Sequence, residues 1–396
     1  MPQVQEFVRS SQLIRPLGSR HSFSDVADTT GEHLSLERLP RSISVDATRT
    51  TVSVDGAIRY GELARSLHAA GLGLANMASL GHISVAGACA TATHGSGDRN
   101  RCLAASVRAL QVVRVDGEIQ TVDQATPDEL NGCVVSLGAL GVVVGLTLEV
   151  EPTYDVQQDV YDDLLFDTFI ERLDEVFAAG YSVSCFTDWR RPMIDQVWLK
   201  TRIAGPGSAP PPQELFGAQR TTEQRHPIRG MSSDACTLQG GVPGPWHERL
   251  PHFRLDHTPS AGREIQSEYF VGRRDGPDAV IALRGLADRI SDVIQVSELR
   301  TVAADDLWLS PAHGRDSVAI HFTWKPDEAA VRRLLPAIEA VLEPFDPRPH
   351  WAKVFTMPPD RVRAGYDRAN DFVSLAGRFD PTGKFRNDFL RRYLFG

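Results

Sequence analysis

The chain carries Arg15-Pro16-Leu17-Gly18-Ser19-Arg20-His21-Ser22-Phe23 near its start, and this run decides the fold together with a second one. The second run extends from Asn76 to Gly97 and reads NMASLGHISVAGACATATHGSG. Small residues and hydroxyls at this density let backbone N–H groups approach a phosphate closely. One run alone favours a tight turn with an incidental histidine, whereas two such runs in one region favour a nucleotide cofactor.

The usual signatures of nucleotide and acyl chemistry are absent from the sequence. No GxGxxG follows a strand, since Gly71-Leu72-Gly73 has Asn76 at the third glycine, and neither a Walker loop nor a GxSxG elbow occurs. His247 and His252 superficially resemble a zinc helix, but they lie five residues apart and Pro251 would break the helix. This segment therefore predicts a surface or structural role.

Length and composition set the broad class. A chain of 396 residues with 42% hydrophobic and 23% charged residues suits a globular protein of two domains. The net charge of -9 argues against a nucleic-acid partner, and no apolar run approaches the roughly 20 residues that span a membrane. Five widely spaced cysteines without a CxxC pair predict free thiols in a reducing compartment, so we expect a cytoplasmic protein.

The first 150 residues alternate between strand and helix patterns. Hairpins are indicated by apolar alternation on both sides of a turn, and a helix is indicated by apolar residues on one face followed by glycine. The predicted elements are a hairpin within 43–54, a helix at 60–70 that ends at Gly71, a hairpin within 112–122 that turns at Asp116-Gly117, and a buried strand at 142–150.

Beyond Pro152, helices and strands alternate around a segment rich in proline and glycine. This segment, from Ala204 to Trp246, predicts a long surface excursion within a domain. From His350 onward the pattern returns to strand and then helix. The other predicted elements are helices at 168–179, 278–294 and 328–342 and strands at 182–188, 196–203, 297–302 and 318–324.

The order of motifs along the chain resembles one family. The glycine-rich runs are similar to those of the vanillyl-alcohol oxidase flavoprotein superfamily and, within it, of the alditol and xylitol oxidases. The similarity continues through later motifs and covers nearly the whole chain. These motifs are GVPGPWHERLPHF at 241–253, RTVAAD at 300–305, HFTW at 321–324, HWAKVF at 350–355 and DPTGKF at 380–385.

The resemblance implies an α+β fold in which two domains share the chain. A PCMH-type FAD-binding domain would be built from both ends of the chain, at 1–155 and 350–396. A central substrate-binding domain at 156–349, an antiparallel sheet flanked by helices, would cover the reactive face of the flavin. The return to strand and helix after His350 agrees with this arrangement.

The resemblance also implies where the cofactor lies. Related oxidases bond a histidine of the first run to the flavin, which assigns a covalent FAD link to His21, with Cys102 as the other candidate. The first run would wrap the pyrophosphate, and the second would line the isoalloxazine and ribityl parts. The implied cofactor contacts are Pro16, Leu17, Gly18, Ser19, Arg20, His21, Ser22, Ser79, Ser84, Gly87, Thr91, Ala92, Thr93, His94, Val143 and His350.

Polar residues in the later half of the chain carry the catalytic resemblance. Glu298 and Arg300 are two apart on a predicted strand, so both project from one face, and His321 and Thr323 share a face likewise. Taken alone, Glu298 and Arg300 favour an ordinary ion pair on a solvated strand. The resemblance instead implies a substrate site made of Ser79, Glu298, Arg300, Thr323 and Lys353.

The implied reaction oxidises the terminal primary hydroxyl of an alditol such as xylitol or sorbitol to an aldose and reduces O2 to hydrogen peroxide. Hydride passes to flavin N5 while the hydroxyl loses its proton, so Lys353 and Arg300 are expected to stabilise the developing alkoxide. Glu298 and Thr323 would hold neighbouring hydroxyls. Glu298 could be a general base, although two nearby cations weaken it, and His321 is the competing base.

Three departures from the related sequences concern the cofactor. Arg20 stands where relatives carry the glycine that precedes the linked histidine, so the backbone must accommodate a Cβ. Gly81 replaces a proline, which predicts a looser loop after Ser79. Relatives precede the region of Met1 with a further strand and turn, and we expect weaker FAD retention or incomplete flavin attachment here.

Other functions remain as alternatives. An aldonolactone oxidase or dehydrogenase shares the fold and the histidyl flavin within the superfamily. A metal-dependent hydrolase would use His247, His252 and His257, and a flavin-free relative would serve as a binding scaffold. The resemblance favours a monomer whose partners are a small polyol and O2.

Overall fold

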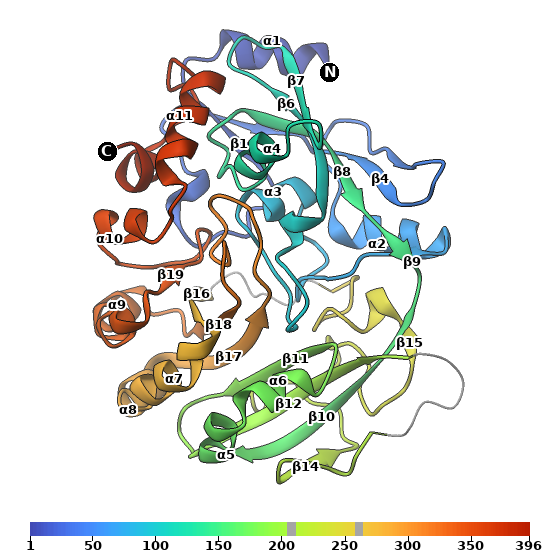
Figure 1. Ribbon diagram of the computed structural model, residues 1–396, viewed down its shortest axis with the longest axis vertical. Helices are drawn as coiled ribbons and strands as arrows, with labels where there is room; N and C mark the ends of the chain where they lie inside the picture. Colours follow the sequence, from blue (N-terminus) through green and yellow to red (C-terminus); the bar gives the residue numbers. More distant parts are fainter. Residues whose placement is uncertain (204–210, 258–263) are drawn as a thin grey trace.

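The computed structural model describes residues 1–203, 211–257 and 264–396. The first residues of the predicted excursion, 204–210, lie outside these ranges. Two main sheets organise the described residues. A five-stranded sheet lies in the upper half of Figure 1, and a ten-stranded sheet extends through the lower half.

The five-stranded sheet is antiparallel, with the strand order β3-β4-β8-β6-β7. Both predicted hairpins and the predicted buried strand are confirmed. The second hairpin turns where Gly117 adopts a φ of +79°, and the backbone N–H of Glu118 donates to the Asp116 carboxylate. The strands are β3 (Ile43–Val45), β4 (Thr51–Asp55), β6 (Val107–Val113), β7 (Ile119–Asp123) and β8 (Val142–Glu149).

Short helices and two small sheets surround this sheet. The predicted helix before Gly71 is confirmed. Gly71 lies just past its end and has a φ of +73°, which is typical of a glycine that ends a helix. The helices are α1 (Pro2–Ser10), α2 (Tyr60–Ala69), α3 (Val85–Ala90), α4 (Pro127–Val134), α10 (Pro359–Ala364), α11 (Ala369–Phe379) and α12 (Asp388–Leu390). The small sheets pair β1 (Ile14–Leu17) with β2 (Glu32–Ser35) and β5 (Leu72–Gly73) with β9 (Glu151–Pro152).

Both ends of the chain fold against the five-stranded sheet. Figure 1 shows α11 near β1 and α4, although α11 and β1 come from opposite ends of the sequence. The buried guanidinium of Arg15 joins them, since it donates to the backbone carbonyls of Val26 at 2.5 Å, Leu137 at 2.6 Å, Gly138 at 3.1 Å and Phe385 at 2.6 Å. Three segments of the chain are therefore fixed to one side chain.

The ten-stranded sheet pairs all its strands antiparallel. Its order is β13-β14-β10-β12-β11-β17-β18-β16-β19, with β15 pairing with β10. The predicted domain boundaries stay predictions. The strands are β10 (Asp155–Leu165), β11 (Ser182–Thr187), β12 (Met193–Arg202), β13 (Glu214–Leu215), β14 (Ala218–Thr221), β15 (Gly244–Pro245), β16 (Ile265–Gly272), β17 (Ile294–Val302), β18 (Ser317–Trp324) and β19 (Arg348–Pro349).

The helices that pack on this sheet differ from the prediction in two places. The predicted helices 168–179 and 278–294 are each broken, the first at Arg172 and the second at Gly285-Leu286. On both sides of each break the helices bury apolar residues. The predicted helix 328–342 is confirmed, and Asp327 caps it. The helices are α5 (Phe166–Glu171), α6 (Leu173–Ala178), α7 (Gly276–Arg284), α8 (Ala287–Val293) and α9 (Glu328–Leu342).

The predicted strand after His350 is wrong, and two further features were not predicted. In the described part of the chain no strand follows His350, and the short strand β19 precedes it instead. The described part of the excursion, 211–246, adds β14 to an edge of the sheet beside β10. Residues 2–10 form a helix, because Val4 and Val8 recur on one face and are buried.

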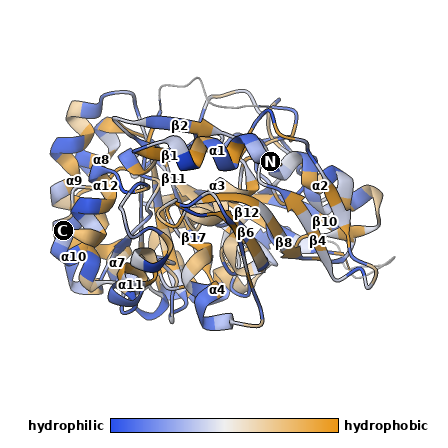
Figure 2. Ribbon diagram, turned by 90° about the horizontal axis from the view of Figure 1, so that it is seen from above, coloured by the Kyte–Doolittle hydropathy of each residue, from blue (hydrophilic) through white to orange (hydrophobic). Residues whose placement is uncertain are grey.

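The core is apolar and contains large aromatic side chains. Trp198, Trp246, Trp324 and Trp351 are fully buried, and Trp324 stacks on Phe322 with ring centroids 4.9 Å apart. In Figure 2 the inner strands β6 and β8 are strongly hydrophobic, whereas peripheral helices mix hydrophilic and hydrophobic residues. All five cysteines are buried and free, as predicted. Within the described residues, no helix combines the length and apolar character needed to cross a membrane.

Candidate active site

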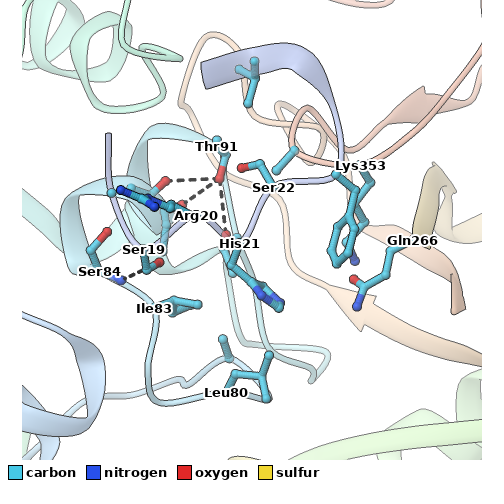
Figure 3. Close-up of a pocket in the computed structure, with 18 of the residues that line it drawn as sticks. Ser19, Arg20, His21, Ser22, Leu80, Ile83, Ser84, Thr91, Gln266 and Lys353 are labelled. Atoms are coloured by element: carbon cyan, nitrogen blue, oxygen red, sulfur yellow. Dashed lines mark hydrogen bonds between the residues drawn. The ribbon is translucent and has the colours of Figure 1, made fainter. Parts of the chain in front are cut away.

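A cavity of about 850 Å³ is lined by both glycine-rich runs and by strands of the ten-stranded sheet. Figure 3 shows Ser84 and Thr91 on the side of the runs, with Gln266 and Lys353 on the other side of His21. The first run begins in β1 and the second contains α3, whereas Gln266 lies on β16. Segments far apart in the sequence therefore share one cavity.

Nearly all the residues predicted for the site line this cavity. Ala92 differs, because it is buried in the core with 1% exposure and has a left-handed φ of +55°. Cys102 is also buried outside the lining, where its thiol lies 3.3 Å from the Asp305 carboxylate. The predicted residues that line the cavity are Pro16, Leu17, Gly18, Ser19, Arg20, His21, Ser22, Ser79, Ser84, Gly87, Thr91, Thr93, His94, Val143, Glu298, Arg300, His321, Thr323, His350 and Lys353.

The two runs meet backbone to backbone at a pair of glycines. A Cβ on Gly18 would lie 2.6 Å from the hydroxyl oxygen of Ser84, and a Cβ on Gly87 would lie 2.7 Å from the same atom. The Ser84 hydroxyl is buried and has no hydrogen-bond partner among the described residues. A donor without a partner in a cradle that only glycine permits is suited to a phosphate or hydroxyl of a bound molecule.

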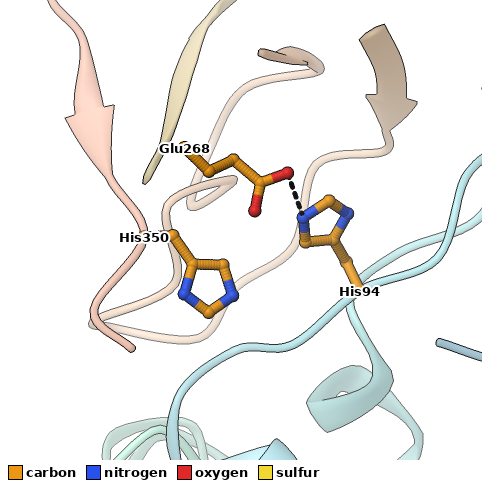
Figure 4. Close-up of side chains that lie close together, drawn as sticks. All are labelled: His94, Glu268 and His350. Carbon is orange, nitrogen blue, oxygen red and sulfur yellow. Dashed lines mark ion pairs between the residues drawn. The ribbon is translucent and has the colours of Figure 1, made fainter. Parts of the chain in front are cut away.

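The far wall centres on Glu268, which the sequence did not predict. One carboxylate oxygen accepts from Lys353 Nζ at 2.6 Å, and the other accepts from Arg300 at 2.8 Å. Figure 4 shows His94 beside the same carboxylate, with Nε2 at 3.2 Å. Burial alone would raise the pKa of Glu268, but Lys353, His94 and Arg300 together hold it well below its usual value.

His94, Glu268 and His350 lie close enough to suggest a metal site, since their ligand atoms are within 4.8 Å of one another. The backbone N–H of Ala352 donates to His350 Nδ1 at 3.1 Å, so the proton of this ring is on Nε2 and that atom is not free to coordinate. The cation of Lys353 already pairs with Glu268. These contacts favour a hydrogen-bonded cluster over a cation site.

A second buried carboxylate, Glu298, lies on β17 next to Arg300. It accepts from His252 Nε2 at 2.7 Å, and it faces Arg300 Nε at 3.5 Å and His321 Nδ1 at 3.6 Å. Burial raises the pKa of Glu298, while Arg300 and His252 outweigh burial and hold the pKa well below its usual value. The cavity wall therefore carries two ionised carboxylates and two cations with little access to water.

Comparison with known proteins decides the family. Residues 3–123 match the FAD binding domain family, and residues 258–393 match the D-arabinono-1,4-lactone oxidase family. An alditol oxidase from a Streptomyces species is 50% identical over 383 residues, which cover 95% of this chain and 89% of that protein. The chain belongs to the alditol oxidase family.

More distant relatives place the alditol oxidase family within a wider group of flavoprotein oxidoreductases. An L-gulono-1,4-lactone dehydrogenase from Mycobacterium tuberculosis is 29% identical over 409 residues, covering 99% of this chain and 92% of the relative. Cholesterol oxidase from Brevibacterium sterolicum superposes with a TM-score of 0.78 at 13% identity, covering 99% of this chain and 92% of that one. The predicted α+β, PCMH-type FAD-binding fold is confirmed.

The residues of this alditol oxidase family member fit FAD. The glycine cradle at Gly18 and Gly87 admits a chain of phosphates against backbone N–H groups, and the unpartnered Ser84 hydroxyl supplies a donor. Ser19 fixes the entrance of this cradle, because its hydroxyl accepts from the Ser84 backbone N–H at 3.2 Å. His21 lies on the lining beyond it, and its ring packs edge-on against His82 at 5.0 Å.

Arg20, which directly precedes His21, adopts a left-handed φ of +58°. Such a conformation costs an L-residue roughly 1–2 kcal/mol, and glycine avoids this cost but loses roughly 0.5–1 kcal/mol through greater freedom of the unfolded chain. We therefore expect Arg20→Gly to raise the free energy of unfolding by about 0.5 kcal/mol in urea titration. Arg99→Gly, at an exposed residue without a positive φ, is the control and should lower it. A loss of stability in Arg20→Gly would show that the side chain outweighs the strain.

The loop after Ser79 is held in place, so the predicted looseness at Gly81 is not supported. The Gly81 carbonyl accepts from the Gly61 N–H at 2.7 Å, and a Cβ on Gly81 would lie 2.4 Å from the Leu255 side chain. The Phe253 N–H also donates to the Ser79 carbonyl at 3.2 Å. Close packing against Gly61 and Leu255 explains why glycine suits this position.

The prediction of a surface or structural role for the segment of His247 and His252 is wrong for His252. His252 is 6% exposed, lines the cavity and donates to Glu298. His247 instead packs against His68, with ring centroids 4.7 Å apart, and His257 is exposed. The three histidines proposed for a metal-dependent hydrolase do not come together, so that alternative has no support.

The excursion also contributes to the site. His226, Ile228 and Met231, all within 211–246, line the cavity opposite the cofactor loops. The sequence predicted only a surface excursion for this segment. Its proline-rich composition does not indicate that it forms part of the cavity wall. For Glu268 the sequence does contain a signal. Gln266 and Glu268 are two residues apart on a strand, so two polar side chains lie on the same face.

Proposed function

We propose that this protein oxidises the terminal primary hydroxyl of an alditol to an aldose and reduces O2 to hydrogen peroxide. The observation that carries this proposal is the charged wall formed by Glu268, Glu298, Arg300 and Lys353. A linear polyol presents one hydroxyl on each carbon, and such a wall supplies donors and acceptors along its length. Bound FAD supplies the acceptor for the substrate hydride and passes the electrons to O2.

We infer that FAD is covalently attached to His21. Burial, with smaller contributions from His82, Lys353 and His321, lowers the pKa of His21 to about 4. The ring is therefore neutral near pH 7, and a nitrogen lone pair is available for a bond. The position on the cavity lining and the similarity to an alditol oxidase support this inference.

The two cations would stabilise the alkoxide that develops as the hydroxyl loses its proton. The side chains of Lys353 and Arg300 are only 13% and 6% exposed, so water screens them little. Glu268 holds both of them in place on the wall. Thr323, on β18, and Ser79, in the second run, line the same cavity and would bind the other hydroxyls.

His321 is the base that the contacts favour. Its Nδ1 faces Glu298 at 3.6 Å, while its Nε2 is buried and has no hydrogen-bond partner among the described residues. Burial and Lys353 lower the pKa of His321 to about 4, so the ring is neutral and Nε2 has a free lone pair; a base this weak accepts the hydroxyl proton as the hydride departs and the hydroxyl becomes strongly acidic. Glu298, by contrast, is stabilised as an anion by Arg300 and His252 and would hold hydroxyls instead.

A lactone oxidase or dehydrogenase is the second candidate, because residues 258–393 match the D-arabinono-1,4-lactone oxidase family. The test supplies xylitol, sorbitol and L-gulono-1,4-lactone separately, with O2 or a dye as acceptor. Peroxide formation with the alditols and little turnover of the lactone is the expected result. Preference for the lactone would overturn the proposal, and reduction of the dye without peroxide would identify a dehydrogenase.

We expect His21→Ala to lose all covalently bound flavin. After acid precipitation the wild-type pellet should be yellow, whereas the variant should release its flavin into the supernatant or contain none. His82→Ala is the matched control, since this ring contacts His21 and its pellet should stay yellow. A yellow pellet from His21→Ala would place the bond elsewhere, and partial colour in wild type would support the incomplete attachment predicted from the sequence.

A further inference from the structure

We propose that Lys200 is a positioning residue, which fixes the tautomer of His252 so that His252 donates a hydrogen bond to Glu298. The inference rests on the proposed function, in which Glu298 accepts from the hydroxyls of the polyol. Lys200 lies on β12 and does not line the cavity, so any effect on the substrate passes through His252.

The ammonium group of Lys200 has three acceptors for its three protons. Its Nζ contacts the backbone carbonyls of Leu250 at 2.5 Å and Pro251 at 3.3 Å and the ring atom Nδ1 of His252 at 3.1 Å. The residue is 1% exposed. An ammonium group has no acceptor capacity, so Nδ1 of His252 is required to be the unprotonated nitrogen.

The other nitrogen of His252 then carries the proton. Its Nε2 lies 2.7 Å from the carboxylate oxygen of Glu298, a distance typical of a short hydrogen bond to an ionised acceptor. Burial, followed by the charge of Lys200, lowers the pKa of His252 to about 4, so the ring is neutral and has one proton to place. Lys200 decides that this proton lies toward Glu298.

Without the ammonium group the ring has a second arrangement. The proton can move to Nδ1, which no longer faces an ammonium group, and the lone pair of Nε2 then faces Glu298. That lone pair repels the carboxylate, and Glu298 loses both a donor and a nearby cation. Both changes raise the pKa of Glu298 and favour its protonated form, which no longer accepts two hydroxyls.

Charged and titratable groups from several elements face Lys200 and Glu298. Glu298 and Arg300 of β17 and Cys236 of the excursion face Lys200. Burial lowers the pKa of Lys200 to about 7, although Glu298 opposes this shift. Glu298 itself is faced by Arg300, His252 and His321, and it also acts on Cys185 of β11 and on Lys353.

The direct test measures the tautomer of His252 by NMR of the flavin-loaded protein labelled with ¹⁵N-histidine. The His252 signal is assigned as the one lost in His252→Gln. At pH 6 the wild type is expected to show the proton on Nε2, and Lys200→Met should move it to Nδ1. A proton on Nδ1 in wild type would overturn the proposal without any variant, as would an unchanged tautomer in Lys200→Met.

The second test follows kcat/KM for the best alditol against pH. Lys200→Met is expected to move the acid limb to higher pH, because Glu298 then becomes protonated alongside His321, whose pKa is about 4. In the His252→Gln background the same change should leave the limb in place, since the intermediary is absent. An equal shift in both backgrounds would show that Lys200 acts without His252.

Lys384→Met is the matched control. Lys384 also donates to three backbone carbonyls, those of Val8 at 2.7 Å, Arg9 at 3.2 Å and Val115 at 3.3 Å, but it contacts no imidazole of the cavity. Its loss should change neither the His252 tautomer nor the acid limb. The tautomer does not depend on turnover, so failure of every alditol as a substrate would reject the proposed function and leave the NMR result to decide this inference.

Discussion

Glu268→Gln is expected to lower kcat/KM for the alditol by about 10²- to 10³-fold, the usual cost of losing a preorganised donor at a developing oxyanion. The carboxylate holds Lys353 at 2.6 Å and Arg300 at 2.8 Å, and a neutral amide releases both cations. Two buried cations without their anion also destabilise the fold, by roughly 3–5 kcal/mol when one partner of a buried pair is removed. Steady-state kinetics and urea unfolding measure the two effects.

The pH profile separates this role from a general loss of stability. Burial lowers the pKa of Lys353, and Glu268 opposes that shift. The charged form of Lys353 is lost as pH rises through its pKa, so removal of Glu268 should move the alkaline limb of kcat/KM to lower pH. Glu339→Gln is the control, because Glu339 accepts from Tyr269 and Thr356 away from the cavity lining. An alkaline limb that stays in place in Glu268→Gln would contradict the assigned role.

Lys353→Met should lower kcat by about 10²- to 10³-fold while flavin content stays at the wild-type level. An ammonium group that stabilises mainly the developing alkoxide contributes little to ground-state binding, so KM should change by much less than kcat. Lys325→Met is the matched control, since Lys325 donates to the backbone carbonyl of Asp292 outside the cavity lining. A large rise in KM with kcat preserved would reassign Lys353 to substrate binding alone.

The sequence predicted the parts of the fold that local rules govern. The hairpin at Asp116-Gly117 and the helix Glu328–Leu342 follow from turn chemistry and apolar periodicity. The predicted helices 168–179 and 278–294 were wrong at Arg172 and Gly285, where each helix is interrupted although the apolar periodicity continues across the break. Tertiary packing, which periodicity does not contain, decides such breaks.

The cavity residues that belong to recognisable motifs could be predicted from the sequence. Their charge partners on distant segments could not. His21 and Lys353 belong to motifs that resemble a family, and both line the cavity. Glu268 has no such motif, and its importance depends on the register that places β16 beside β18. His252 and Lys200 are 52 positions apart in the sequence. They are in contact because the chain that follows the proline-rich segment packs against β12. Charge partners of this kind become visible only in three dimensions.

The contacts of Arg15 have a consequence for biosynthesis. This side chain closes on Phe385, 370 positions later, and on residues 137 and 138. At roughly 5–20 residues per second, the ribosome adds Phe385 about 20–70 seconds after Arg15, so the loop of His21 lacks this support for that time. Flavin capture is therefore a late event in the life of the nascent chain, and a ribosome stalled before residue 385 should carry a colourless polypeptide.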